Sequence, residues 1–306
     1  MRQNGRTISA RLEYFNHRPN PLPEISFMPE LPEVETMRRG VLGITGATIK
    51  SAARTPCPKR PIEIRPTIGR PNKRVAGRKI ASVDRLGKRV VIRLDSDDRL
   101  IFEPRMTGLV LIADPPTTIH LRFALELSGV PVKELLFWDR RGLGKVTLLS
   151  DRQYQQKLTD GSLGPDALSI DAEQLRERLR HSRREIKVAL LDQSAVAGVG
   201  NLYASEILHL AGVHPQTRCD KLTQKRWSLI HQCMIDILET AIKYEGSTLS
   251  DGTYRNALNK SGGYQNEHRV YDCAGKTCPT CHRQPIERIV QAQRSTFFCK
   301  KCQTRR

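Results

Sequence analysis

A methionine followed by a proline, Met28 and Pro29, offers the most distinctive chemistry in the chain. If the methionine is the first residue and is removed, Pro29 carries a free secondary amine, which is a nucleophile. Attack of such an amine on the aldehyde carbon of a sugar forms an iminium ion, which promotes elimination of a β-substituent. The neighbouring Glu30 can move protons for that reaction. The pair predicts covalent catalysis on a sugar; the alternative is a surface helix that begins at a proline.

Four cysteines near the carboxyl end have the spacing of a metal site. Cys278 and Cys281 form one Cys-x-x-Cys pair, Cys299 and Cys302 form a second, and seventeen residues lie between the pairs. Two such pairs are typical of a structural Zn²⁺ site with four thiolate ligands. A disulfide framework is the alternative, because the chain has eight cysteines. The other four are scattered and no secretory signal accompanies them, which favours one structural Zn²⁺ ion.

The chain is strongly basic. Its 306 residues include 51 Lys and Arg against 32 Asp and Glu, which gives a net charge of +19. This excess suits a polyphosphate surface, so nucleic acid is the expected partner. No apolar run approaches the roughly eighteen residues of a membrane span, so no membrane partner is expected. We predict a monomer in the cytoplasm, associated with a nucleoid of bacterial type.

Residues 1–27 form a separate problem. They lack the continuous apolar stretch of a signal peptide and carry four arginines, Arg2, Arg6, Arg11 and Arg18. We interpret this leader as disordered, or as a segment that is not translated because the true start codon is that of Met28.

The elements that must position these residues can be read from apolar periodicity. Apolar residues at helical spacing predict a short helix with Pro29 at its amino end; they are Leu31, Val34, Met37 and Val41. Residues 52–77, rich in Pro, Arg and Lys, predict a loop or an insertion over a basic surface. Short segments punctuated by Gly, Pro and Asp predict a β-sandwich or barrel, with strands at 79–83, 89–94, 100–102, 108–112, 120–126, 134–138 and 145–149.

The second half of the chain has a different pattern. Residues 150–170 predict a linker, 171–245 predict helices, and the polar segment 246–277 predicts a long mobile excursion. In the cysteine-rich segment, one strand is predicted over 286–290 and another over 295–299, with 291–294 near the turn.

A Gly-Val-Gly-Asn turn at 198–201 precedes a predicted helix that starts at Leu202. The two glycines let the backbone turn tightly and approach a ligand, and Asn201 is a good helix cap. Exposed amides at a helix amino end bind phosphate without reading base sequence. A plain helix connector is the alternative.

Taken together, residues 28–35, the turn within 192–206, and Gln293-Arg294 followed by Thr296-Phe297-Phe298-Cys299 resemble the formamidopyrimidine-DNA glycosylase family. Members of that family cut damaged purines from DNA. The resemblance runs from Met28 to the carboxyl end. It implies an α+β multidomain fold: an N-terminal β-sandwich with flanking helices (28–160), a helical domain with a helix-two-turn-helix (161–265), and a C-terminal zinc-finger hairpin (266–306).

The resemblance also implies an activity and catalytic residues. The expected enzyme is a DNA glycosylase that excises 8-oxoguanine and formamidopyrimidines from duplex DNA and nicks abasic sites by β/δ-elimination. Pro29 would form the Schiff base and Glu30 would move protons. Lys88, in the turn 86–91, matches a lysine that binds phosphate and assists catalysis. Arg294 matches an arginine that contacts phosphates at the lesion. Ordinary surface roles are the alternatives for both cations.

Further residues match the DNA-contacting positions of the family. Met106 matches a methionine that fills the space of the extruded base, and Arg141 an arginine that faces the orphaned cytosine. Leu143 stands where a phenylalanine wedge is usual. Glu33 matches a residue near the damaged base; a solvated helix glutamate is the alternative.

Two positions depart from the family pattern. Glu103 stands where a histidine commonly lies three residues before the methionine, and Thr118 lies near a usual DNA-contacting histidine. The neighbouring His120 could compensate for Thr118, although a lone strand histidine is more often structural.

Two rival functions stay open. One is the related endonuclease VIII type, which prefers oxidised pyrimidines; residues 31–35 favour the purine type. The other is a catalytically silent zinc-finger DNA-binding protein, which follows if the leader is retained, because a proline nitrogen within an amide has no nucleophilic lone pair.

Overall fold

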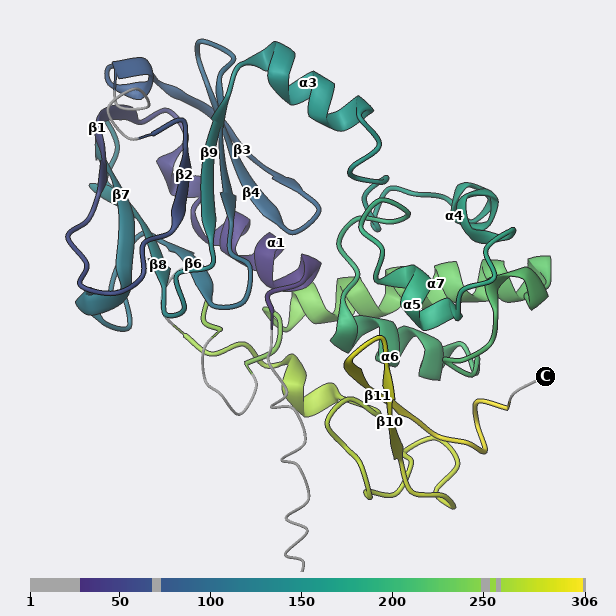
Figure 1. The fold of residues 1–306 in the computed structure, drawn as a ribbon. Coiled ribbons are helices and arrows are strands. Elements are labelled where there is room, and N and C mark those ends of the chain that lie inside the picture. The colour runs from purple at the N-terminus through teal and green to yellow at the C-terminus, as the bar shows by residue number, and fades with distance from the viewer. Residues whose placement is uncertain (1–27, 68–72, 249–253, 257–259, 305–306) are drawn as a thin grey trace, which may run out of the picture.

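The structure, a computed structural model, describes residues 28–304 except 68–72, 249–253 and 257–259. The leader, residues 1–27, which we expect to be disordered or not translated, lies outside the described residues. Within them, two β-sheets, a group of helices and a small hairpin follow one another along the chain (Figure 1).

The first part of the described chain contains two sheets that pack against each other. One has the strand order β1 (Thr48–Arg54), β7 (Leu121–Ser128), β8 (Glu134–Asp139), β6 (Gly108–Leu111). The other has the order β2 (Glu63–Arg65), β9 (Lys145–Leu149), β5 (Arg99–Glu103), β4 (Arg89–Leu94), β3 (Ile80–Leu86). All pairs are antiparallel except β2 with β9. Phe102 of one sheet meets Phe123 and Phe137 of the other at ring-centroid distances of 5.9 and 5.7 Å. The predicted β-sandwich is therefore confirmed.

Two sequence-based expectations in this region are wrong. Residues 52–77, expected as a loop, contain the end of β1 and all of β2. Both strands lie at sheet edges and bury few residues, so their apolar alternation is weak. The predicted linker 150–170 contains the helix α3 (Asp151–Thr159). Its start carries a capping box, in which the Ser150 amide donates to Gln153 Oε1 over 2.9 Å.

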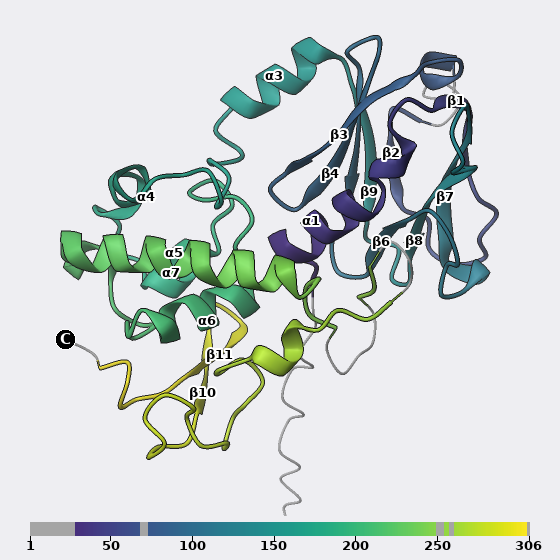
Figure 2. The same ribbon diagram turned by 180° about the vertical axis from the view of Figure 1, so that it is seen from behind.

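The helix α1 (Leu31–Gly40) joins the two halves of the molecule. Its residues 31–37 are buried, and it packs against β3, β4 and β6 on one side and against the long helix α7 (Gln224–Lys243) on the other. Figure 2 shows α1 running from the sandwich towards the helical group. That group also contains α4 (Ala172–Leu179), α5 (Ile186–Leu190) and α6 (Asn201–Leu210). Short 3₁₀ turns lie at η1 (Leu42–Ile44), η2 (Thr118–His120), η3 (Cys219–Lys221) and η4 (Tyr264–Glu267).

The chain ends in the expected hairpin. Strands β10 (Glu287–Gln291) and β11 (Arg294–Phe298) pair antiparallel, and α6 packs on β11. The polar excursion 246–277 falls partly outside the described residues; its described parts are anchored by the buried rings of Tyr254 and Tyr264. Among the described helices, none has both the length and the apolar character needed to cross a bilayer.

Candidate active site

The amino end of α1 meets the amino end of α6. Glu30 is 3% exposed, and its carboxylate accepts hydrogen bonds from the Leu202 amide (Oε1, 2.9 Å) and the Tyr203 amide (Oε2, 3.4 Å). These amides have no partner within their own helix, and the helix dipole favours a negative charge there. Two segments about 170 residues apart are thus joined at Glu30, directly beside Pro29.

The glycines of the 198–201 turn make this approach possible. A Cβ added at Gly200 would lie 2.3 Å from the Glu30 carboxyl carbon, and one at Gly198 would lie 2.5 Å from Leu31 Cδ1. Gly198 also has a φ of +113°, and its carbonyl accepts a hydrogen bond from the Leu31 amide over 3.1 Å. The predicted tight turn is confirmed. The amides at the start of α6 were expected to bind a phosphate, but in the structure they donate to the Glu30 carboxylate.

The expected capping role of Asn201 is wrong. Gly200 caps α6, and the Asn201 side chain turns to the zinc-finger hairpin, where Nδ2 donates to the Ser295 carbonyl over 3.0 Å. Its Oδ1 accepts from Lys187 Nζ over 2.7 Å. A helix cap needs a side chain that folds back on its own amides, and these competing partners hold Asn201 away from them.

Glu33 is fully buried one turn into α1. Its carboxylate accepts hydrogen bonds from Tyr203 Oη (2.6 Å), the Ser247 amide (2.9 Å) and the Glu30 amide (2.9 Å). Burial raises the pKa of Glu33 to about 7, against the hydrogen bond from Tyr203, which lowers it. Glu33 therefore ties α1 to α6 and to the segment after α7. The alternative of a solvated helix glutamate is excluded.

A cavity of about 300 Å³ opens beside Pro29. Its walls come from α1, the β3–β4 turn, the end of β5, the segment before α6 and the hairpin. The lining residues are Met28, Pro29, Lys88, Arg89, Glu103, Arg105, Leu191, Gln193 and Arg294. Three predicted catalytic residues, Pro29, Lys88 and Arg294, thus lie around one cavity, with Glu30 buried behind the proline.

The charges around the cavity act on Lys88. Burial lowers the pKa of the Lys88 ammonium, the Glu30 carboxylate opposes that change, and the Arg294 guanidinium adds to it. Burial likewise raises the pKa of Glu30, while Lys88 lowers it. The site therefore brings an acid and a base closer together in proton affinity than the free side chains are, which suits proton transfer near neutral pH.

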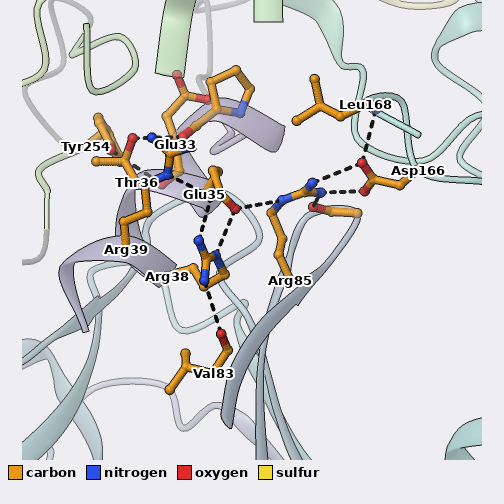
Figure 3. Close-up of polar contacts among 12 residues, drawn as sticks. Glu33, Glu35, Thr36, Arg38, Arg39, Val83, Arg85, Asp166, Leu168 and Tyr254 are labelled. Atoms are coloured by element: carbon orange, nitrogen blue, oxygen red, sulfur yellow. Dashed lines mark hydrogen bonds and ion pairs between the residues drawn. The ribbon is translucent and has the colours of Figure 1, made fainter. Parts of the chain in front are cut away.

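A chain of ion pairs holds the Lys88 turn against the second half of the molecule (Figure 3). Arg85 donates to Glu35 of α1 (3.2 Å), to the Gly87 carbonyl within the turn (3.0 Å), and to both carboxylate oxygens of Asp166. The segment of Asp166 continues into Ala167, whose amide donates to the Ala197 carbonyl over 2.9 Å. One arginine thus connects α1, the Lys88 turn and the segment before α6.

Lys187 of α5 is a site residue that the sequence analysis missed. It is 1% exposed, and Nζ donates to Asn201 Oδ1 (2.7 Å), the Ser295 carbonyl (3.0 Å) and Thr296 Oγ1 (2.7 Å). Burial lowers the pKa of Lys187 to about 7, and the Glu30 carboxylate opposes this. The only signal in the sequence is a lysine inside the apolar run 186–191.

The predicted DNA-contacting residues Met106, Arg141 and Leu143 lie on two neighbouring loops. Buried Asp139 joins these loops, since Oδ1 accepts from Thr107 Oγ1 and from the Arg141 amide, the latter over 3.1 Å. Its Oδ2 accepts the Gly144 amide over 2.7 Å. Met106 and Leu143 are half-buried and the Arg141 side chain is exposed.

His120 lies in the turn η2, and not at the start of a strand as predicted. Its ring packs edge-on against Trp138 at 5.6 Å, and burial together with the Arg122 charge lowers the pKa of the imidazole. Thr118 begins the same turn. Neither residue lines the cavity beside Pro29.

The four predicted zinc ligands converge. The sulfur atoms of Cys278, Cys281, Cys299 and Cys302 all lie within 4.8 Å of one another. The Sγ–Sγ distances are 3.8 Å for Cys278–Cys302 and 3.7 Å for Cys281–Cys299. A tetrahedron with Zn–S bonds of about 2.3 Å has edges of about 3.8 Å, so the cluster fits one structural Zn²⁺. None of the eight cysteines, all within the described residues, forms a disulfide.

Three segments of the chain match known family profiles in the expected order. Residues 28–146 match the formamidopyrimidine-DNA glycosylase N-terminal domain and 163–253 match the H2TH domain of the same enzymes. Residues 275–305 match the zinc finger found in FPG and IleRS.

Whole-chain relatives agree with these matches. Formamidopyrimidine-DNA glycosylase of Chloroflexus aurantiacus is 41% identical over 281 residues, covering 90% of this chain and 98% of the relative. That of Thermus thermophilus is 36% identical over 279 residues, with the same coverage.

Solved structures of the Lactococcus lactis enzyme are also similar. Its complex with DNA containing an abasic site has a TM-score of 0.79 at 33% identity, and a complex of a variant with Fapy-dG DNA has 0.80 at 34%. Both comparisons cover 90% of this chain and 100% of the other. With the fold, the four-cysteine cluster and these relatives in agreement, this chain belongs to the formamidopyrimidine-DNA glycosylase family.

Proposed function

We propose that this protein is a bifunctional DNA glycosylase and abasic-site lyase that removes oxidised purines from duplex DNA. The observation that carries the proposal is the single cavity lined by Pro29, Lys88 and Arg294, with Glu30 buried beside the proline. The net charge of +19 supports a polyanionic partner. The relatives' names and the DNA in the related solved complexes support damaged duplex DNA as that partner.

The first step needs the damaged nucleotide to be flipped out, because C1′ of its sugar is inaccessible inside the base stack. The Pro29 nitrogen attacks C1′, the bond to the base breaks, and the base leaves with the bonding electrons. Glu30 donates a proton to the ring oxygen as the sugar opens. Burial raises the pKa of Glu30, which favours the protonated carboxyl that this step requires.

The second stage is strand cleavage. The iminium ion accepts the electrons released when the proton at C2′ is removed, and the 3′-phosphate leaves; a second elimination expels the 5′-phosphate. Lys88 and Arg294, which line the same cavity, would hold the phosphates at the lesion. Met106, Arg141 and Leu143 would fill the gap left in the duplex.

Zinc has no part in these steps. Its four thiolate ligands fill a tetrahedron and leave no position for water, so the metal supports the hairpin that carries Arg294.

The mechanism requires a free amine on Pro29, and the test follows from that requirement. Three proteins are compared by borohydride trapping on an 8-oxoguanine:cytosine duplex: the 306-residue chain, the chain beginning at Met28, and the shorter chain with Pro29→Gly. We expect a strong covalent adduct from the chain beginning at Met28, none from the 306-residue chain, and little from the Pro29→Gly variant. The amine should be partly neutral at pH 7, because α-amino groups titrate near about 7.7–8.0.

Mass spectrometry supplies the control, by showing that the long chain stays uncleaved and that the Met28 residue is removed from the short one. If the intact long chain traps as well as the short one, Pro29 is not the nucleophile. If no form traps but all bind DNA, the catalytically silent alternative is correct.

Substrate choice needs a separate experiment. A solved complex of the Lactococcus lactis enzyme holds DNA with an oxidised pyrimidine, which keeps the pyrimidine-specific alternative in view. Cleavage of 8-oxoguanine and thymine-glycol duplexes should be compared at equal enzyme concentration. We expect the purine lesion to be cut faster.

A further inference from the structure

Glu103 is an anion in a cationic cavity. Among the described residues that line the cavity beside Pro29 it is the only carboxylate, and it stands with four cations, Lys88, Arg89, Arg105 and Arg294. A cavity that receives a phosphodiester gains nothing directly from a negative charge. The position of Glu103 therefore calls for a role other than contact with the substrate.

The two oxygens of Glu103 face different arginines. Oε1 lies 3.4 Å from Arg89 Nε and Oε2 lies 3.5 Å from Arg105 Nε. The Glu103 side chain is 20% exposed, whereas those of Arg89 and Arg105 are 30% and 47% exposed. The carboxylate is thus the most sheltered member of the cluster, and the outermost member, Arg105, is the one that passing DNA would meet first.

Each arginine belongs to a turn that carries a predicted functional residue. Arg89 follows Lys88 at the start of β4, and Arg105 precedes Met106 between β5 and β6. Arg105 has a φ of +56°, a conformation that is uncommon for a residue other than glycine. Its ion pair with Glu103 helps to hold that turn and links it to the Lys88 turn.

We propose that Glu103 is a specificity-determining residue that competes with DNA phosphate for Arg89 and Arg105. On undamaged DNA the ion pairs of Glu103 with the two arginines weaken the attraction of the protein for the DNA backbone, because each phosphate contact requires an arginine to leave Glu103. On damaged DNA the same pair keeps the Met106 turn in shape. Discrimination between the two duplexes therefore depends on Glu103. This inference rests on the proposed function in DNA repair.

The test compares Glu103→Gln with a matched control, Glu177→Gln. Glu177 of α4 also lies between two arginines, Arg176 (2.9 Å) and Arg180 (2.8 Å), but does not line the cavity. Both changes remove one negative charge, so a general effect of net charge is cancelled. Dissociation constants are measured on undamaged and abasic-site duplexes over a range of salt concentrations, with the chain beginning at Met28.

We expect Glu103→Gln to tighten binding to the undamaged duplex roughly three- to tenfold relative to the control. The slope of log K against log salt should steepen by about 0.9, the value for one added phosphate contact. Binding to the abasic duplex should tighten less, so the ratio of the two constants falls. Adding Arg89→Gln and Arg105→Gln together should remove the gain, because the two released arginines are its source.

Glu103→His serves as a second variant in case Glu103→Gln unfolds, which a thermal unfolding curve detects. The inference is overturned if Glu103→Gln and Glu103→His bind undamaged DNA no more tightly than the control, or if the gain survives the loss of both Arg89 and Arg105. If the unchanged protein binds neither duplex, the proposed function fails as well; if it binds and traps abasic DNA while the variants match the control, only the role of Glu103 fails.

Discussion

The two walls of the cavity are held in place by different physics. The amino end of α1, with Pro29, is fixed by buried hydrogen bonds to Glu30 and Glu33 from backbone amides and a tyrosine. The hairpin that carries Arg294 has a four-cysteine cluster in the same small unit, and its strand β11 packs on α6 and is hydrogen-bonded to Lys187 and Asn201. The first wall therefore depends on packing and protonation, and the second depends on a metal in addition to its packing on α6. Perturbations should separate them.

Removal of zinc should have the largest effect. Binding of a structural Zn²⁺ supplies about 10–16 kcal/mol of apparent free energy to such a small unit, so chelation should unfold the hairpin and weaken DNA binding without melting the β-sandwich. Metal analysis, circular dichroism and DNA titration before and after chelation check this. Cys281→Ser should reproduce the loss, whereas Cys273→Ser, outside the cluster, should not. Freshly purified protein without metal would contradict the prediction.

The other wall should respond to pH through Glu33. Its pKa is near 7 in the folded protein and about 4.5 ordinarily, so the folded state binds more protons between these values. The free energy of unfolding should then fall as pH rises from about 4.5 to 7, by on the order of 3 kcal/mol. Urea titrations at several pH values test this. Glu33→Gln should flatten the dependence of stability on pH. The control is Glu126→Gln, which changes a glutamate in an exposed ion pair with Lys50 and should leave the dependence unchanged. Equal slopes for the unchanged protein and both variants would refute the role of Glu33.

Gly200→Ala should disturb the same wall through sterics. The new Cβ would lie 2.3 Å from the Glu30 carboxyl carbon, which must then leave the α6 amides. We expect a loss of about 1–3 kcal/mol in stability and a marked loss of borohydride trapping, with zinc still bound. Gly43→Ala, whose Cβ would meet Val132 at 3.5 Å, is the control. Normal trapping by Gly200→Ala would mean that catalysis does not require the Glu30 carboxylate to lie at the α6 amides.

The smallest effect concerns uniform DNA affinity. Arg294→Ala should weaken binding to every sequence alike and, by loss of one phosphate contact, reduce the salt slope by about 0.9. Asn201→Ala should weaken binding to every sequence indirectly, because Asn201 holds the Ser295 carbonyl next to Arg294. Fluorescence anisotropy on unrelated duplexes measures both quantities, with Arg180→Ala of α4 as the control. A dissociation constant that does not depend on salt would contradict a phosphate-based interface.

Local patterns were sufficient for much of the fold and for some of the site. The strands over 89–94 and 145–149 were predicted at the bounds observed, because each is a short segment rich in apolar residues that lies between clear turns. Edge strands β1 and β2 and the helix α3 were missed, since each buries little and its pattern is weak. The Asn201 cap failed because a local rule was overridden by Lys187 and the hairpin.

The sequence alone determined the zinc site and identified Pro29 as the candidate nucleophile. Two Cys-x-x-Cys pairs at this spacing are typical of one four-thiolate metal site, and the chemistry of a free proline amine is intrinsic to that residue. Tertiary structure alone decided that Glu30 lies under amides about 170 residues away, that Lys187 is buried against the hairpin, and that Glu103 stands between two arginines. The contacts of Glu30 and Lys187 join segments far apart in the sequence, and burial sets the proton affinity of both groups. No local spacing encodes either.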